Sequence, residues 1–166
     1  MDSIEHQVSL APLTTLGVGG PAEYFVRVRT KEALVEALAY AREHHLAVTV
    51  LGGGSNVVVP DAGVRGLVIK NELEGITAAE DAAGQRVRVT AGAGVVFDEL
   101  VAYTVAAGWW GLENLSAIPG SVGATPVQNV GAYGVEVREC IERVEVVDVR
   151  TGDAHSMVPE ACRFAY

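Results

Sequence analysis

The sequence of 166 residues is poor in positive charge and in long apolar runs, and each shortage excludes a class of partner. Lys and Arg total 12 against 21 Asp and Glu, which gives a formal net charge of -9. Such a surface repels nucleic acid and anionic membranes, whose binding depends on Lys and Arg beside phosphates. No apolar run approaches the roughly 18 residues of a membrane-spanning helix. We therefore expect neither nucleic acid nor membrane as a partner.

Secretion signals and cysteine pairs are also missing. The N-terminus lacks the basic and then apolar order of a signal peptide, so we expect a cytoplasmic location. Cys140 and Cys162 form no CxxC pair, and we expect two small buried thiols in a reducing compartment. The four histidines show no metal-ligand spacing. Hydrophobic residues nevertheless make up 49% of the chain, which excludes disorder and predicts a folded core.

The first half of the chain has a strand–helix–strand pattern. Residues 24–29 alternate between apolar and polar side chains, as in a strand. Thr30 fits the N-cap of a helix that extends to residue 44, with apolar positions three and four residues apart. Short strands follow over 47–51 and 65–70. A unit of this length predicts parallel pairing.

The second half mixes short strands with helices. Residues 86–91 alternate as a strand, and 96–107 form an amphipathic helix that carries Val105 on its apolar face and ends at Gly108. Residues 141–158 predict an antiparallel hairpin with a turn at 150–153. One further helical turn is expected at 159–163. Trp109 and Trp110 are expected to plug the core.

These patterns predict an α+β chain of two lobes. The polar, Ala-rich stretch 71–84 is interpreted as the connection between them. The first lobe, 1–71, is a parallel βαβ unit, and the second, 72–166, is mixed. In open sheets of this kind, ligands bind where glycine-rich loops follow the strands.

Three successive glycines follow the predicted strand 47–51. Glycines 52–54 let the backbone turn with positive φ and expose successive N–H groups, which can form an anion-binding nest. Ser55 and Asn56 add short hydrogen-bonding side chains. No Gly-Lys-Ser/Thr follows, which excludes a P-loop, and Val57 stands where a Rossmann fingerprint needs glycine. A tight turn and a phosphate cradle both fit this segment, and its residues leave the choice open.

A second segment, 111–134, is dense in Gly, Pro, Ser and Asn yet low in charge. A solvated loop would carry more charge, so we expect this one to be packed. Residues 121–124 could form a short helical turn whose free N–H groups face an anion. Residues 128–133 add two amides and a phenol. Glu113 could cap this loop or meet a ligand.

Five segments, in this order and spacing, resemble the UDP-N-acetylenolpyruvoylglucosamine reductase (UDP-N-acetylmuramate dehydrogenase) family. They are TLGVGGPA at 15–22, LGGGSN at 51–56, GLENL at 111–115, IPGSVG at 118–123 and QNVGAYG at 128–134. The resemblance covers residues 13–166, although Thr14 stands where the family usually has Asn.

The resemblance implies an FAD-binding fold of the p-cresol methylhydroxylase and vanillyl-alcohol oxidase type, with two α/β lobes and FAD between them. It implies that the first glycine loop receives the pyrophosphate and that the second loop lies along the flavin. The cofactor-binding residues implied are Leu51, Gly52, Gly53, Gly54, Ser55, Asn56, Val57, Ile118, Pro119, Gly120, Ser121, Gly123, Ala124, Thr125, Gln128, Asn129 and Gly131. Tyr133 matches a position close to the substrate pocket.

The resemblance also implies a reaction and its partners. NADPH reduces the flavin, and the reduced flavin reduces the enolpyruvyl double bond of a UDP-sugar. A protonated side chain then completes the product, UDP-N-acetylmuramate, a precursor of bacterial peptidoglycan.

The segment CRFAY at 162–166 begins a family motif that continues with an arginine. The chain stops at Tyr166, so that arginine, the later Ser or Cys proton donor, the late Glu and the C-terminal substrate-binding domain have no counterpart here, and no catalytic residue is assigned. We expect either the FAD-binding part of a longer reductase, inactive alone, or a shortened relative. An FAD-dependent alcohol or phenol oxidase domain and a non-catalytic flavin-binding module are the alternatives.

Overall fold

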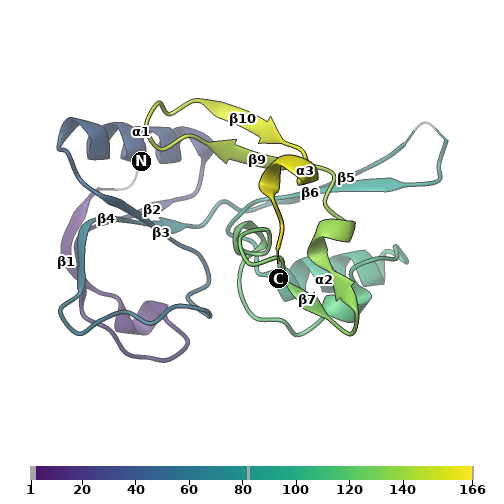
Figure 1. Ribbon diagram of the computed structural model, residues 1–166, viewed down its shortest axis with the longest axis horizontal. Coiled ribbons are helices and arrows are strands. Elements are labelled where there is room, and N and C mark those ends of the chain that lie inside the picture. Colours follow the sequence, from purple (N-terminus) through teal and green to yellow (C-terminus); the bar gives the residue numbers. More distant parts are fainter. Residues whose placement is uncertain (1–2, 82, 166) are drawn as a thin grey trace. The chain divides into compact units, whose positions relative to one another are not determined.

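The computed structural model describes residues 3–81 and 83–165, which form two compact units (Figure 1). The first unit runs to residue 73 and includes 145–156, and the second comprises 74–144 with the segment from 157 onward. The expected boundary lies two residues earlier, and residues 145–156 were expected in the second lobe. Tyr166, the last residue of that expected lobe, lies outside the described residues.

A four-stranded sheet forms the first unit. Its strands are β1 (Glu5–Ser9), β2 (Pro21–Val28), β3 (Val48–Leu51) and β4 (Val64–Asn71), in the order β1-β2-β4-β3. Both β2 and β3 run parallel to β4, which confirms the parallel pairing, but β4 lies between them. Strand β1, which pairs antiparallel with β2, was not predicted. The loop after β3 therefore leaves the sheet at its edge.

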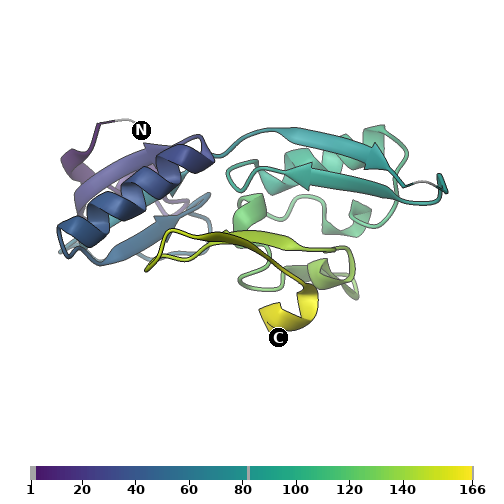
Figure 2. The same ribbon diagram turned by 90° about the horizontal axis from the view of Figure 1, so that it is seen from above.

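The sheet is covered on both faces. Helix α1 (Lys31–Glu43) begins at Thr30, whose hydroxyl accepts a hydrogen bond from the Ala33 N–H (3.1 Å), as predicted. Figure 2 shows α1 lying across the sheet. The cluster beneath the helix contains Val26, Val28, Ala37, Leu38, Leu67 and Ile69, and the cluster on the opposite face contains Leu10, Ala22, Phe25, Leu51 and Val68. Two covered faces are typical of parallel strands.

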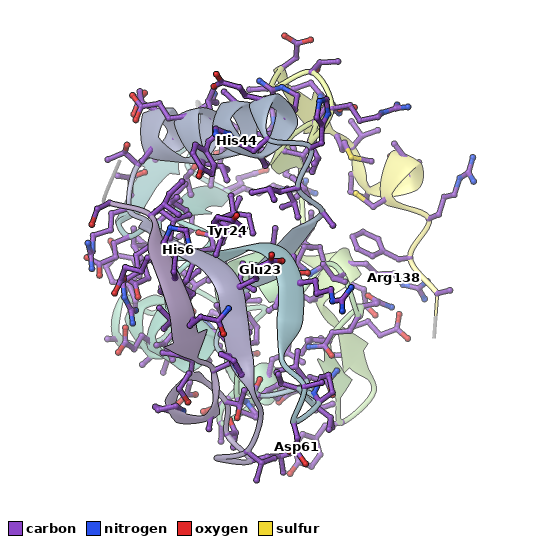
Figure 3. All side chains as sticks on the ribbon, turned by 90° about the vertical axis from the view of Figure 1, so that its left-hand side faces the viewer. His6, Glu23, Tyr24, His44, Asp61 and Arg138 are labelled. Carbon is purple, nitrogen blue, oxygen red and sulfur yellow. The ribbon has the colours of Figure 1, made fainter. Side chains whose placement is uncertain are left out.

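One extra residue in β4 is accommodated by a side chain of β2. The register between β2 and β4 shifts between Ala22 and Tyr24, and the intervening Glu23 accepts a hydrogen bond from the Gly66 N–H (2.8 Å). On β1, the His6 ring lies against Tyr24 with their centroids 4.8 Å apart (Figure 3). These contacts link the three strands β1, β2 and β4.

The second unit packs a hairpin on a helix. Strands β5 (Ile76–Glu80) and β6 (Val87–Ala91) pair antiparallel and lie over α2 (Phe97–Ala106) in Figure 2. The buried face of α2 is Phe97, Leu100, Val101 and Thr104. Val105, expected on that face, is exposed, because the helical period places Thr104 there instead. The Thr104 hydroxyl is paired, since it donates to the Val101 carbonyl (2.9 Å). Strand β5 lies in the stretch interpreted as a connection.

Short elements complete the chain. They are the 3-10 turns η1 (Ala11–Leu13), η2 (Glu113–Leu115), η3 (Val122–Ala124) and η4 (Val137–Glu139), the strands β7 (Gly131–Ala132), β8 (Val135–Glu136), β9 (Val144–Val147) and β10 (Ala154–Met157), and α3 (Pro159–Cys162). Strands β9 and β10 form the predicted hairpin. Within the described residues, no helix is long and apolar enough to cross a membrane.

Two expected core residues lie at the surface. Trp110 is 92% exposed, and only its neighbour Trp109 packs, edge-on against Tyr103. Cys140 is exposed and Cys162 half-buried, so the expected burial of both thiols is wrong. The Cys140 thiol donates instead to the Gly111 carbonyl (3.1 Å), and burial on that side raises its pKa.

The cap of α1 gives a test of the local fold. Thr30→Ala removes the oxygen that accepts from Ala33, and we expect it to lower the free energy of unfolding by about 1 kcal/mol. Thr30→Ser keeps the oxygen and should retain most of that stability. Urea unfolding measures both, and equal losses would show that the cap contributes nothing.

Candidate functional site

The glycine loop after β3 is packed against residues 13–15 of the first unit. Gly54 has a φ of +74°, and a Cβ there would lie 2.0 Å from the Leu13 carbonyl oxygen. The Gly54 carbonyl accepts a hydrogen bond from the Thr15 N–H (3.0 Å). This position therefore needs glycine, both for its left-handed backbone and for its close approach to the neighbouring chain.

Two carbonyls of this loop accept hydrogen bonds from the first unit, while its N–H groups stay unpaired among the described residues. The Lys70 ammonium donates to the Gly52 carbonyl, and the Thr15 N–H donates to the Gly54 carbonyl. Within the part of the chain that the structure describes, the N–H groups of Gly52, Gly53, Gly54 and Ser55 donate no hydrogen bond. Those of Gly53 and Ser55 belong to the two peptides whose carbonyls are held. Gly53 is exposed and Ser55 half-buried. The loop thus offers unpaired backbone donors, two of them on peptides of fixed orientation, which is the chemistry of an anion site.

Lys70 was missed by the sequence reasoning. It lies near the end of β4, in register with Leu51 of β3 and Arg27 of β2. The only sequence signal for Lys70 was a positive charge at the end of an apolar strand, next along the chain after the strand that precedes glycines 52–54. Burial lowers its pKa, Glu72 opposes that shift, and Arg27 adds to it.

The second loop uses its backbone differently. The Val122 N–H donates to the Val95 carbonyl and the Gly123 N–H to the Ala93 carbonyl, both at 2.9 Å. The Ala124 N–H donates within the turn to Ser121 (2.9 Å). The expectation of free N–H groups over 121–124 is therefore wrong for these three residues. A Cβ on Gly123 would lie 2.6 Å from the Ala93 side chain, so the two segments are in close contact.

In the second loop, the groups left for a ligand are buried side-chain atoms, since the backbone N–H groups of residues 122–124 are already paired. Ser121 is 4% exposed and Asn129 is 5% exposed. Neither the Ser121 Oγ nor the Asn129 Oδ1 has a hydrogen-bond partner among the described residues. Buried polar atoms are nearly always paired, so each of these points to a partner from outside the chain.

The orientation of Asn129 is fixed by its neighbours. Its Nδ2 donates to the Glu136 Oε2 (2.8 Å), which also pairs with the Arg138 guanidinium (2.7 Å). The Glu136 carboxylate can only accept, so it faces the amide nitrogen and leaves Oδ1 as the unpaired atom. A ligand group that meets the Asn129 Oδ1 must therefore carry an N–H or an O–H.

Tyr133 lies at the tip of a two-residue hairpin turn. Strands β7 and β8 flank it, and both Tyr133 (φ 52°) and Gly134 (φ 81°) have the positive φ of a type I′ turn. The Tyr133 side chain is 90% exposed. A bulky residue is uncommon at such a position, where Asn is preferred, and the turn holds the ring out from the unit.

Carboxylates at the start of α2 and beside η2 hold the second loop in place. Asp98 accepts from the Ser116 hydroxyl (3.1 Å) and from the Ala117 N–H (2.6 Å), where Ala117 has a φ of 62°. Glu113 accepts from the Gly111 N–H (2.6 Å). Glu113 was expected either to cap this loop or to meet a ligand, and the structure shows it as the cap.

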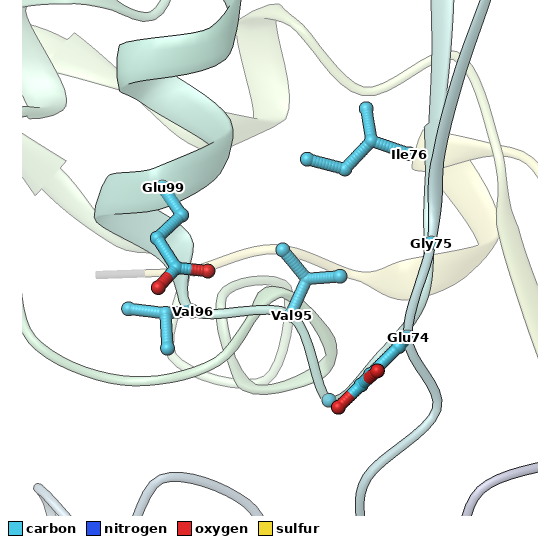
Figure 4. A pocket seen from close by; sticks show the side chains of 7 residues that line it. Glu74, Gly75, Ile76, Val95, Val96 and Glu99 are labelled. Atoms are coloured by element: carbon cyan, nitrogen blue, oxygen red, sulfur yellow. The ribbon is translucent and has the colours of Figure 1, made fainter.

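A hollow of about 390 Å³ lies in the second unit (Figure 4). Its lining is Glu74, Gly75, Ile76, Gly94, Val95, Val96 and Glu99. Val95 and Val96 border it and also pair with residues 121 and 122 of the second loop. Two carboxylates at its edge disfavour an anion, so it does not suit a phosphate.

The remaining expected cofactor residues fall into the two units as follows. Residues 51–57 all lie in the first unit, with Leu51 buried and Val57 exposed, and 118–133 lie in the second. Thr125 is buried, Ile118, Gly120 and Ala124 are half-buried, and Pro119, Gln128 and Gly131 are exposed. No group of His, Cys, Asp and Glu among the described residues could hold a metal ion.

Comparison with known proteins identifies the family to which the chain belongs. A protein-family model described as an FAD binding domain matches residues 22–157. The chain belongs to this FAD binding domain family, and the family's cofactor is FAD. The structure is also similar to a VAO-type flavoprotein from Myceliophthora thermophila, with a TM-score of 0.64, 15% identity and coverage of 84% of this chain and 27% of that one. The expected α+β fold of the vanillyl-alcohol oxidase type is confirmed.

Two relatives are nearer in sequence. UDP-N-acetylenolpyruvoylglucosamine reductase of Pseudomonas fluorescens is 42% identical over 163 residues, covering 98% of this chain and 48% of that protein. The crystal structure of UDP-N-acetylenolpyruvylglucosamine reductase (MurB) from Thermus caldophilus matches with a TM-score of 0.76 and 34% identity, over 99% of this chain and 55% of that one. The resemblance stated from the motifs is confirmed. The chain spans about half the length of the curated relatives it matches.

The close approach at Gly54 is testable. Gly54→Ala should lose about 1–2 kcal/mol of unfolding free energy through its left-handed φ and more through the contact with the Leu13 carbonyl. Gly17→Ala is the matched control, because Gly17 also has a positive φ (67°) but has open space around it. Urea unfolding compares the two variants. Equal losses would contradict the packing of this loop against residues 13–15.

The cap at Glu113 predicts a pH dependence. Hydrogen bonds from the Gly111 N–H and from its own backbone N–H lower the pKa of this carboxyl. A lowered pKa stabilises the fold above the unfolded-state pKa, and that stability is lost as the pH falls through the folded-state pKa. Glu113→Gln should therefore be less stable than the parent at about pH 7, and the gap should close towards about pH 3. Glu43→Gln controls for the loss of one charge, and a gap independent of pH would contradict the assignment.

Proposed function

We propose that the chain is the FAD-binding portion of a cytoplasmic, NADPH-dependent reductase that converts UDP-N-acetylenolpyruvoylglucosamine to UDP-N-acetylmuramate in peptidoglycan synthesis. The proposal includes the two lobes expected from the sequence, 1–71 and 72–166, as FAD-binding lobes, and a further substrate-binding domain as partner. Support comes from the named relatives, which the chain matches over nearly all of its own length.

The observation that carries the proposal is the donor pair of Gly53 and Ser55 in the first glycine loop. FAD contains a pyrophosphate whose oxygens only accept hydrogen bonds. Two unpaired N–H groups on peptides held by Lys70 and Thr15, with the positive charge of Lys70 close by, match that chemistry in a chain whose net charge is -9.

The second unit supplies groups that suit the rest of the cofactor. The free Oδ1 of Asn129 requires a donor, and FAD offers ribityl hydroxyls and a ring N–H. The Ser121 hydroxyl can donate or accept. The orphaned atoms therefore fit FAD, and we assign the cofactor-binding residues that the resemblance implies to this role. Tyr133, held outward by its turn, is assigned to the substrate.

These residues bind and orient; none is assigned a catalytic role. When bound, FAD supplies the hydride chemistry of the reaction. The Gly53 and Ser55 N–H groups would fix one end of the cofactor, and Asp98 and Glu113 would keep the second loop in the shape that positions Ser121.

A flavin titration tests the proposal. The purified chain should bind FAD, seen as a change in flavin fluorescence, and release it on denaturation. With NADPH and the UDP-sugar added, NADPH absorbance should stay constant. Failure to bind FAD would overturn the proposal, and flavin that stays attached after denaturation would favour the oxidase alternative.

A substitution at Ser121 tests whether its hydroxyl binds the cofactor or only stabilises the fold. Ser121→Ala removes an unpaired buried hydroxyl, so we expect unfolding free energy to be unchanged or higher, while FAD affinity falls about fivefold for one lost hydrogen bond of about 1 kcal/mol. Thr104→Val is the control, because its buried hydroxyl is already paired with Val101. It should lose stability and keep its affinity. A Ser121→Ala variant that binds FAD as tightly as the parent would remove Ser121 from the site.

A further inference from the structure

Lys70 reaches the glycine loop from the sheet. Residues in register across parallel strands point to the same face, and Lys70 shares its row with Leu51 and Arg27. Leu51 packs with Phe25 and Val68 on the face opposite α1. From that face the Lys70 ammonium contacts the carbonyl of Gly52, the first residue after β3.

The surroundings of Lys70 do not otherwise favour an ammonium group there. Its partial burial and the neighbouring Arg27 both disfavour the charge and lower its pKa. Glu72, the carboxylate that favours it, is paired with both Arg27 and Arg29. The hydrogen bond to Gly52 is thus the specific contact that this lysine makes. A half-buried charge with one defined acceptor is a reason to look for a role in a site.

The contact fixes the direction of an N–H group. In a trans peptide the C=O of one residue and the N–H of the next point in opposite directions, and the described residues contain no cis peptide. Because Lys70 holds the Gly52 carbonyl, the Gly53 N–H points away from Lys70. In the same way Thr15 holds the Gly54 carbonyl, so the Ser55 N–H points away from Thr15. Two alternate peptides are therefore oriented by two separate donors.

We propose that Lys70 is a positioning residue for anion binding: by holding the Gly52 carbonyl it presents the Gly53 N–H to the pyrophosphate of FAD. The proposal rests on the proposed function for the identity of the ligand. Lys70 acts through the peptide, from behind the loop, and Thr15 does the same for Ser55. Loss of Lys70 therefore affects one donor of the pair and leaves the other in place.

Binding measurements test this role with the two lysines of the chain, Lys31 and Lys70. Lys70→Met keeps the stem and removes the donor, and we expect FAD affinity to fall about tenfold, as for loss of a charge-assisted hydrogen bond. Riboflavin, which has the flavin ring but no pyrophosphate, should bind the parent and this variant alike. Lys70→Arg keeps a cationic donor and should recover part of the loss. Lys31→Met, on the exposed first turn of α1, should match the parent.

Amide NMR with sodium pyrophosphate distinguishes positioning of the Gly53 N–H from a purely structural role of Lys70. A purely structural role would not change the pyrophosphate-induced shift of the Gly53 resonance alone. In the parent, pyrophosphate should shift the amide resonances of Gly53 and Ser55. In Lys70→Met the Gly53 shift should be lost and the Ser55 shift retained. If Lys70→Met does not fold, Lys70→Leu, which also lacks a donor, carries the same test, and its Gly53 shift should likewise be lost.

The outcomes separate this inference from the proposed function. A parent chain that binds neither FAD nor pyrophosphate would overturn the proposed function. A parent that binds FAD, together with a folded Lys70→Met that binds it equally well and keeps the Gly53 shift, would overturn only the role of Lys70. Equal weakening of FAD and riboflavin would also overturn it, because the effect would not pass through the phosphates.

Discussion

The capacity of the first glycine loop to bind an anion depends on where its carbonyl groups point. A flexible run of glycines can expose either carbonyls or N–H groups, and only the second choice attracts a phosphate. Here the Gly52 and Gly54 carbonyls are occupied by Lys70 and by the Thr15 N–H, so the Gly53 and Ser55 N–H groups point away from those two donors. The requirement for glycine at 54 follows from the same packing, since the loop must approach Leu13 closely.

In the second glycine-rich loop, the backbone N–H groups of residues 122–124 are used for packing and not left for a ligand. Its N–H groups are paired with residues 93 and 95 and hold the loop to the segment before α2. What remains for a ligand is side-chain chemistry, the hydroxyl of Ser121 and the amide oxygen of Asn129. Two loops of similar composition thus contribute backbone donors in one unit and buried side-chain atoms in the other.

Local signals predicted most of the fold, and long-range pairing accounts for the rest. The helix capped by Thr30 and the hairpin of β9 and β10 have strong periodicity and turn residues, and both were found. Strand β1 is polar and β5 is Ala-rich, and both become strands only through their partners. In the site, composition located both loops, but the use of each N–H group depends on partners distant in sequence. The role of Lys70 could not be predicted from the sequence, because only the pairing register of β3 and β4 brings this residue to Gly52.

The most direct measurement of the central claim is a crystal structure of the chain with FAD. We expect phosphate oxygens of the pyrophosphate within hydrogen-bond distance of the Gly53 and Ser55 backbone nitrogens, with the Lys70–Gly52 contact intact behind them. A pyrophosphate bound on the 121–124 turn, or a glycine loop whose carbonyls face the cofactor, would contradict it.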